Sequence, residues 1–287
     1  MNPQESKDPD VRALDALEDL RLFVHLCWQG LGYAKVATEV MEVLKEARER
    51  RAARGPGSVE IPEEERRHAA RLEEFAKVQL PAGFPYLYSL ASIRVWAILE
   101  SFAADMVLFA IHQYPDVRSL PALRTLSGPL VEFTEASETE QAEIILQLLL
   151  TSVSARLRKG VGRFEAVFNN IGMGGPVADP VRKALLELSE VRNVLIHRDG
   201  RADRQFVQAC PWFGAVAGEP IRLTWPKFDR YVMASHWYLI EISRRQVEKY
   251  PALAPEGTAT PARHRKTQMV LEERLNRPVT DEASPDE

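Results

Sequence analysis

The sequence predicts an all-α fold: a bundle of long helices, with a small β-hairpin before the last long helix. Apolar residues recur at steps of three and four over most of the chain, which is the period of an amphipathic helix. Clusters of proline and glycine divide these segments, as is typical of helix ends. Only two short segments, Gln205–Cys210 and Ile221–Trp225, have the pattern of strands, and a glycine-containing loop separates them.

The first eighty residues predict an N-terminal helical extension, which we assign to residues 1–80. Residues 10–32 and 34–54 carry apolar side chains at helical spacing. We expect Gly30 and Gly32 to loosen or end the first of these helices. After a Gly-Pro-Gly-Ser break, residues 62–80 begin with a proline and three glutamates, which favours the start of another helix.

The main domain is predicted at residues 81–251, after a boundary that contains proline and glycine. Its helices are predicted at residues 86–113, 119–132, 137–158, 163–171, 179–198 and 227–249. The glycine run at 172–175 predicts a flexible connection, because it lacks the lysine and the preceding strand of a phosphate-binding loop. Residues 252–287 are rich in Pro, Thr, Glu and Asp, so we expect a mostly disordered tail.

Composition excludes several classes of function. The 287 residues carry a formal net charge of −4, so any contact with RNA needs a local basic patch. The two cysteines lie far apart and form neither a disulfide framework nor a metal site, so we expect no metal and no cofactor. No apolar signal segment is present at the N-terminus, which favours a cytoplasmic location. Arg94, Glu100 and Asp105 interrupt the most apolar stretch, which therefore predicts a core helix and no membrane span.

The helix predicted at 179–198 has clear local signals at both ends. Asp179 is the expected N-cap and Pro180 the expected first helical residue. Gly200 is the expected stop at the C-terminal end.

Three polar residues gather near the end of this helix. On a helical wheel Arg192 falls within the apolar stripe, where an arginine is costly unless its guanidinium is paired or acts in a cleft. Asn193 and His197 are four residues apart and are therefore neighbours on one side of the helix. His197 also lies in the last turn, where the helix dipole favours a cation.

This group of side chains suits cleavage of RNA without a metal ion. An RNA 2′-hydroxyl attacks the adjacent phosphate once a base removes its proton, and the departing 5′-oxygen needs an acid. Histidine serves as acid or base near neutral pH. Arginine binds phosphate oxygens through two hydrogen bonds and stabilises the charge that develops on them. Asn193 is suited to orient the imidazole or the phosphate, and the expected products carry a 2′,3′-cyclic phosphate and a 5′-hydroxyl.

The segment Arg192-Asn193-Val194-Leu195-Ile196-His197 resembles the motif of HEPN (higher eukaryote and prokaryote nucleotide-binding) domains. That motif is an arginine, a polar residue directly after it, and a histidine a few residues further on. The resemblance covers roughly residues 84–250 and implies a helical bundle of HEPN type. It implies that Arg192 and His197 are catalytic and that Asn193 supports them. Glu100, on the long apolar helix, resembles the acidic residue that often lies near the motif and is a further supporting candidate.

Many HEPN proteins are metal-independent endoribonucleases of toxin or antiphage systems. The resemblance therefore implies RNA as substrate and a homodimer in which two motifs face each other across a composite cleft. It also implies an antitoxin or regulatory protein as a further partner. Two alternatives stay open: a non-catalytic module that dimerises or binds a nucleotide or a partner, and a regulatory subunit that docks through its N-terminal helices.

The motif spacing alone is weakly specific. Arg230 and His236 form a second pair at similar spacing, which we interpret as chance because it lies mid-helix and no turn follows. The structural alternative for Arg192 is a buried ion pair with Glu100 or Asp105. For His197 the alternative is a capping role at the helix end.

Two basic runs predict where an RNA backbone would lie. Arg158 and Lys159 belong to a run without acids, and Arg198, Arg201 and Arg204 follow the motif. If both runs flank one cleft, they could hold the phosphates of RNA; solvated helix ends are the alternative. Aromatic residues that either stack on bases or pack on the core are Trp212, Phe213 and Trp225.

Overall fold

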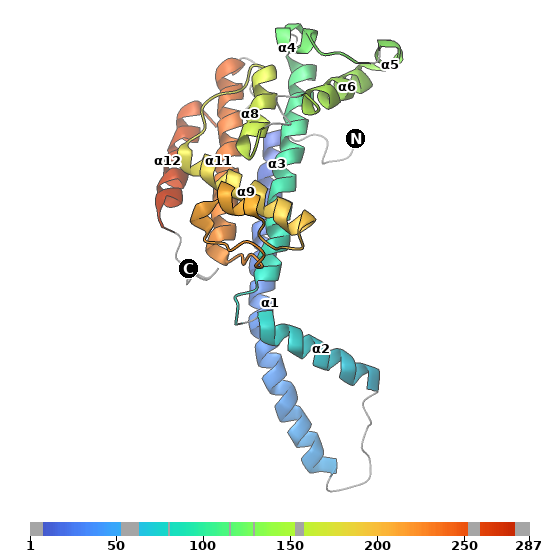
Figure 1. The fold of residues 1–287 in the computed structure, drawn as a ribbon, viewed down its shortest axis with the longest axis vertical. Helices are drawn as coiled ribbons and strands as arrows, with labels where there is room; N and C mark the ends of the chain where they lie inside the picture. Colours follow the sequence, from blue (N-terminus) through green and yellow to red (C-terminus); the bar gives the residue numbers. More distant parts are fainter. Residues whose placement is uncertain are drawn as a thin grey trace.

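The computed structural model describes residues 8–52, 63–79, 81–114, 116–128, 130–152, 158–251 and 259–278. All regular secondary structure in these ranges is helical, which confirms the all-α prediction (Figure 1). The first three helices are α1 (Pro9–Ala52), α2 (Glu63–Gln79) and α3 (Pro85–Gln113). They are followed by η1 (Val117–Ser119), α4 (Pro121–Arg124), α5 (Leu130–Glu135), α6 (Glu138–Leu150) and α8 (Val161–Asn170). The remainder are α9 (Asp179–His197), α10 (Arg204–Ala209), η2 (Pro211–Phe213), α11 (Trp225–Lys249) and α12 (Pro261–Asn276).

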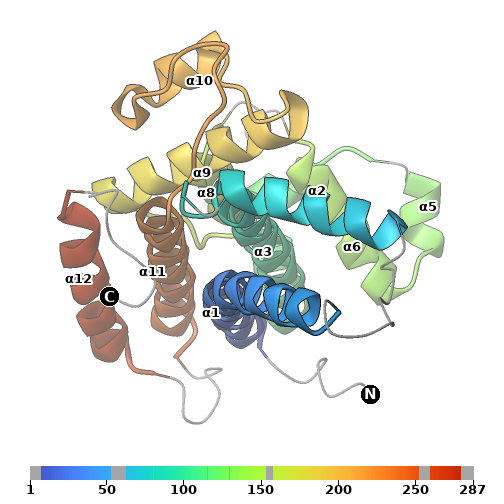
Figure 2. The ribbon, with the colours of Figure 1, turned by 90° about the horizontal axis from the view of Figure 1, so that it is seen from below.

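The core forms where α3, α9 and α11 meet. Figure 2 shows α9 crossing the side of the bundle, with α10 outside it and α3 and α11 beneath it. Aromatic rings fill the contacts: Tyr88 of α3 stacks on Phe228 of α11, with ring centroids 5.8 Å apart. Trp96 of α3 meets Phe164 of α8 at 5.0 Å. Large rings bury much apolar area, so these contacts fix how the helices pack.

Helix α3 is long and apolar enough to cross a membrane by length and composition. Its most apolar window is 56% buried inside the bundle, and its buried residues include Val95, Leu99 and Met106. Packing against α1, α9 and α11 gives these side chains apolar partners. The same composition is therefore accounted for by the position of α3 at the centre of the bundle.

Helix α1 is one continuous helix, so the expected interruption at Gly30 is wrong. A glycine costs only about 1 kcal/mol in a helix, which long flanking segments can absorb. Ala13, Leu17 and Val24 in its first half are buried in the common core. The first half of α1 is thus part of the main bundle, whereas its second half and α2 project away from the bundle (Figure 1).

The predicted β-hairpin is absent from the described part of the chain. Residues 204–209, expected as its first strand, form α10, because the Asp203 side chain accepts a hydrogen bond from the Phe206 backbone at 2.8 Å and caps the helix. The segment 221–225 leads into α11 without forming a strand. A single antiparallel bridge between Arg201 and Pro220 closes the loop between α9 and α11.

Two further expectations need correction. The helix expected at 119–132 is divided into η1, α4 and α5, with Pro121 starting α4 and Gly128 lying in the loop before α5. Part of the expected disordered tail is the helix α12, in which Leu271 and Leu275 are buried against the bundle. Its N-cap, Thr260, accepts a hydrogen bond from the backbone of Arg263 at 3.3 Å. Residues 252–258 and 279–287 of that tail lie outside the described ranges.

A buried network of charges centres on Arg245 of α11. Its Nε donates to Glu241 at 2.8 Å and its Nη1 donates to Glu165 of α8 at 2.9 Å. Its Nη2 donates to the carbonyl of Pro176 at 2.8 Å. Burial opposes ionisation of Glu241, but hydrogen bonds from Arg244, Gln268 and Arg245 outweigh it and hold the pKa of Glu241 below its ordinary value. Every charge in the network therefore has a partner.

The glycine loop before α9 is part of this network and is held by it. Gly175 donates its backbone N–H to Glu165 at 2.9 Å, and the carbonyl of Met173 accepts from Arg245 at 3.2 Å. A Cβ on Gly174 would overlap the side chain of Asn169 and press on its backbone, so only glycine fits there. The expected flexible connection is instead pinned against α8 and α11.

Replacing Arg245 by methionine should therefore destabilise the fold strongly. The variant leaves Glu165 and Glu241 buried without their shared partner, and breaking a buried pair in this way costs about 3–5 kcal/mol. Urea unfolding followed by circular dichroism measures the change. Arg50→Met is the matched control, because Arg50 pairs with Glu46 on the exposed surface of α1 and should change stability by less than about 1 kcal/mol. Equal losses in the two variants would contradict a stabilising role for the network.

Candidate functional site

The motif residues lie on the last two turns of α9. Val191 and Val194 are buried and anchor this end of the helix to the core. Arg192 is half-buried, and Asn193 and His197 are exposed. The Nη1 atom of Arg192 donates to the side-chain oxygen of Asn193 at 3.4 Å. The helix thus holds a guanidinium, an amide and an imidazole together at an open surface.

The turn after His197 ends α9 as the glycine signal predicts. The backbone N–H groups of Arg198 and Gly200 both donate to the carbonyl of Val194, at 3.0 and 3.2 Å. Asp199 and Gly200 have φ angles of 50° and 70°, the left-handed conformation that closes helix ends. At the other end, Ala178 is the N-cap, and Asp179 is the first helical residue instead of the expected cap.

Neither acid proposed as an ion-pair partner of Arg192 binds it. Glu100 pairs with Arg163 at 3.3 Å, and Asp105 pairs with Arg12 at 2.9 Å. Within the described ranges, no carboxylate lies at ion-pair distance from Arg192. The guanidinium of Arg192 is therefore available to an anion from outside, in contrast to the fully bonded Arg245.

The arginines that follow the motif have different surroundings. Arg198 approaches Asp203 at 3.5 Å, and Arg201 donates to the carbonyl of Gly218 at 3.2 Å. Arg204 is exposed. The contacts of Arg198 and Arg201 involve exposed groups, so they are weak, and water or a phosphate can readily replace the partner.

In the other basic run, Arg158 and Lys159, only one of the two side chains is free of a carboxylate partner within the described residues. Lys159 pairs with the buried Glu190 of α9 at 3.1 Å, so its ammonium has a structural role. Arg158 is exposed and has no carboxylate partner among the residues that the structure describes. Of the two expected RNA-binding residues in this run, Arg158 is the one with a free charge.

The two residues of the second arginine–histidine pair make separate contacts. Arg230 donates to the carbonyl of Leu275 in α12 at 2.7 Å. His236 is half-buried, and burial together with the charge of Arg21 lowers its pKa against the opposing effect of Glu18, so it faces α1. The two side chains serve different contacts, which agrees with the interpretation of their spacing as chance.

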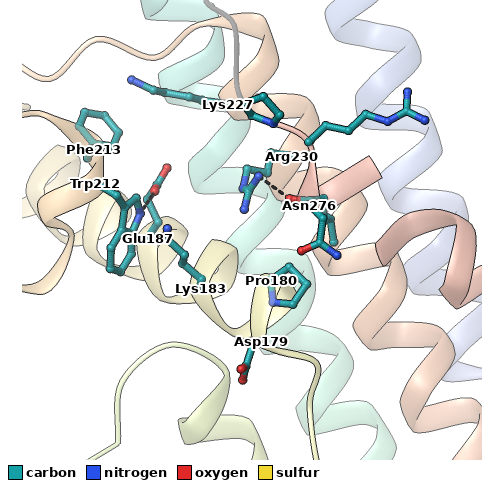
Figure 3. Close-up of a pocket in the computed structure, with 12 residues that line it drawn as sticks. Asp179, Pro180, Lys183, Glu187, Trp212, Phe213, Lys227, Arg230 and Asn276 are labelled. Carbon is teal, nitrogen blue, oxygen red and sulfur yellow. Dashed lines mark hydrogen bonds between the residues drawn. The ribbon is translucent and has the colours of Figure 1, made fainter. Parts of the chain in front are cut away.

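Two pockets open along the N-terminal half of α9, away from the motif. The first, of about 460 Å³, lies between α9, η2, the start of α11 and the end of α12 (Figure 3). Its cations are Lys183, Lys227, Arg230 and Arg277. The second, of about 790 Å³, lies between α9, the start of α8 and the loop before α9. Arg192, Asn193 and His197 line neither pocket.

A buried carboxylate organises the first pocket. Glu187 of α9 is 5% exposed and accepts hydrogen bonds from Trp212 Nε1 and, at 2.7 Å, from the hydroxyl of Tyr231. Figure 3 shows Glu187 between Trp212 and Arg230. The ammonium of Lys183 lies 4.4 Å from the centre of the Trp212 ring, a cation–π contact. The indole is thereby fixed at the mouth of the pocket.

Trp212 was a candidate from the sequence, whereas Lys183 and Lys227 were not, and Arg230 was considered only as part of a chance pair with His236. These cations come from two helices more than forty residues apart, so no local spacing marks them. One signal was present: Lys183 and Glu187 are four residues apart on the polar side of α9.

In the described part of the chain, no three His, Cys, Asp or Glu side chains gather as a metal site. Comparisons with known proteins identify no relative: no family model matches the chain, and neither a curated protein nor a solved structure matches it.

Cys210, behind the first pocket, should resist alkylation in the folded protein. Burial, with Glu187 and Glu190 nearby, raises its pKa to about 12, and only the thiolate reacts. At mildly alkaline pH we expect iodoacetamide to modify the partly exposed Cys27 first, although burial raises the pKa of Cys27 as well. Mass spectrometry of the two peptides measures both rates, and Cys210 should react only when urea unfolds the protein. Equal rates without urea would contradict this burial.

Proposed function

We propose that the chain is a metal-independent endoribonuclease of HEPN type. Arg192 holds the scissile phosphate, His197 transfers a proton, and Asn193 orients the phosphate or the imidazole. The proposal includes cleavage by attack of the RNA 2′-hydroxyl, leaving a 2′,3′-cyclic phosphate and a 5′-hydroxyl. The family resemblance adds a cytoplasmic toxin or antiphage role and an antitoxin or regulatory protein as partner.

The observation that carries the proposal is the free guanidinium of Arg192. A half-buried arginine without a carboxylate is costly, so its position calls for a function. Among the described residues, the one side chain that accepts a hydrogen bond from it is the neutral Asn193, which leaves most of its donors for the oxygens of a phosphate. His197 follows it on the same helix end and is open to solvent. A binding group and a proton-transfer group are therefore available on one surface.

A second copy of the chain would complete this site. The motif lies on an open surface of one chain, whereas phosphoryl chemistry benefits from a closed, low-dielectric site. Ile196 is 45% exposed directly beside His197 and offers an apolar contact for a partner. A homodimer formed through this end of α9 would bring two copies of the motif together. Glu100, paired with Arg163, remains a supporting candidate in this proposal.

Incubating the purified protein with RNA in EDTA tests the proposal. The wild-type chain should cleave, whereas Arg192→Ala and His197→Ala should lose at least about a hundredfold in rate, the usual contribution of an acid or base. Mapping the ends identifies the cyclic phosphate and the 5′-hydroxyl. His112→Ala is the matched control, because His112 is also an exposed histidine in the last turn of a helix, here α3.

No cleavage would contradict the enzyme and favour a second candidate, a nucleic-acid-binding module without catalysis. Cleavage only with added metal would contradict the metal-independent mechanism, and equal loss in the His112 control would contradict the role of His197. A specific observation supports the second candidate, since the two pockets described above lie on the other half of α9. Their lining is basic and aromatic, which suits binding in either case.

A further inference from the structure

The two pockets beside α9 adjoin each other across shared lining residues. Asp179, Lys183 and Trp212 line both of them. Trp212 therefore lies between the two pockets. The first pocket contains Lys227, and the second contains Arg158. We call this combined surface the α9 groove. It extends along the N-terminal half of α9, on the side where η2 and the start of α8 flank the helix.

The charge of the α9 groove is positive although the whole chain is acidic. Its lining contains seven cations, Arg158, Lys159, Arg182, Lys183, Lys227, Arg230 and Arg277. It contains three acids, Glu165, Asp179 and Glu187. All three acids are engaged: Glu165 binds Arg245, Asp179 binds Arg182, and Glu187 accepts from Trp212 and Tyr231.

Four of these cations have no carboxylate partner within the described ranges: Arg158, Lys183, Lys227 and Arg230. Instead, the Nζ atom of Lys183 lies 4.4 Å from the centre of the Trp212 ring. The Nζ atom of Lys227 lies 4.0 Å from the centre of the Phe213 ring. A cation–π contact at an exposed site is weak, so a phosphate can draw these flexible side chains away from the rings. Two of the four free cations of the groove thus lie directly against its aromatic residues.

Trp212 supplies the second element of recognition. Its indole is 42% exposed even though its Nε1 is hydrogen-bonded to the buried Glu187. A ring that is fixed at its edge and open at its surface is a preformed stacking platform. Bases of a single strand stack on such rings, whereas the bases of a duplex are already stacked and paired.

We propose that the α9 groove binds single-stranded RNA, with a base on Trp212 and the flanking phosphates on Arg158, Lys183, Lys227 and Arg230. The preference for a single strand follows from the platform. The choice of RNA over DNA rests on the proposed nuclease function. The groove is separate from Arg192 and His197, so it binds RNA whether or not the motif cleaves it.

Fluorescence anisotropy with a labelled single-stranded RNA, over a series of salt concentrations, tests the groove. All proteins carry His197→Ala, so that the probe stays intact. Each lost phosphate contact should reduce the slope of log K against log salt by about 0.7. Arg158→Gln with Lys183→Gln should therefore reduce the slope by about 1.4 and weaken binding roughly 25-fold in 0.1 M salt. Both residues are exposed, so the fold should not change.

Two further variants separate charge from stacking. Arg124→Gln with Lys266→Gln removes the same charge from exposed positions outside the groove and should leave the slope unchanged. Trp212→Ala should weaken binding about 5- to 150-fold without changing the slope, since it removes a stacking surface and no charge. Because this variant also removes a bond to Glu187, circular dichroism must show an unchanged fold, and Trp212→Phe should restore most of the affinity by keeping a ring.

The outcomes are distinct from those of the nuclease assay. Equal effects of the groove pair and the control pair would overturn the proposal, as would binding of duplex RNA as tight as that of the single strand. Equal loss of single-stranded RNA and DNA binding in the groove pair would support the groove while removing only the choice of RNA. Failure of cleavage in EDTA leaves these binding results unaffected.

Discussion

The buried guanidinium of Arg245 joins three parts of the chain that are distant in sequence. It binds Glu165 in α8, Glu241 in its own helix, and the carbonyls of the loop that leads into α9. The start of α9 is consequently fixed by hydrogen bonds to charged groups, which are stronger than those between neutral groups. One wall of the α9 groove is the same loop, and the motif lies at the far end of the same helix. Both candidate surfaces therefore depend on this one set of contacts.

Two arginines differ in how their guanidinium groups are bonded, and this difference bears on function. Arg245 is buried, and Arg192 is half-buried. Each nitrogen of Arg245 has an acceptor, so its charge is fully used within the fold. Arg192 has one neutral neighbour at 3.4 Å and lies on a surface. Natural folds seldom leave a charge at such a position without a use for it. The bonding of an arginine, more than its burial, separates a structural role from a binding role here.

Local signals allowed parts of the fold to be predicted. α3, α9 and α11 were predicted within about two residues at each end, because proline at their starts and long apolar stripes act over short distances. α10 was mistaken for a strand because six residues are too few to show a period, and the Asp203 cap was not considered. α12 was missed because its two buried leucines become core residues only when the helix packs against α11 and α9.

The candidate site shows the same limit. The end of α9 could be predicted from the sequence, because its residues lie close together along the chain: Arg192, Asn193, His197 and Gly200. The partner predicted for that site, Glu100, binds Arg163 instead, and only the packing of α3 against α8 determines this choice. The α9 groove combines residues from α8, α9, η2, α11 and α12, so it arises only in the folded chain.

Helix α9 also sets a length scale. Lys183 in the groove and His197 in the motif are fourteen residues apart on one helix, which corresponds to about 21 Å at the rise of an α-helix. A helix packed along its whole length against α3 and α11 cannot change that separation. Under the proposed function, a strand bound in the groove would have to be longer than this distance to reach His197 of the same chain. The length of α9 would then separate very short RNAs, which could only bind, from longer RNAs, which could also be cut.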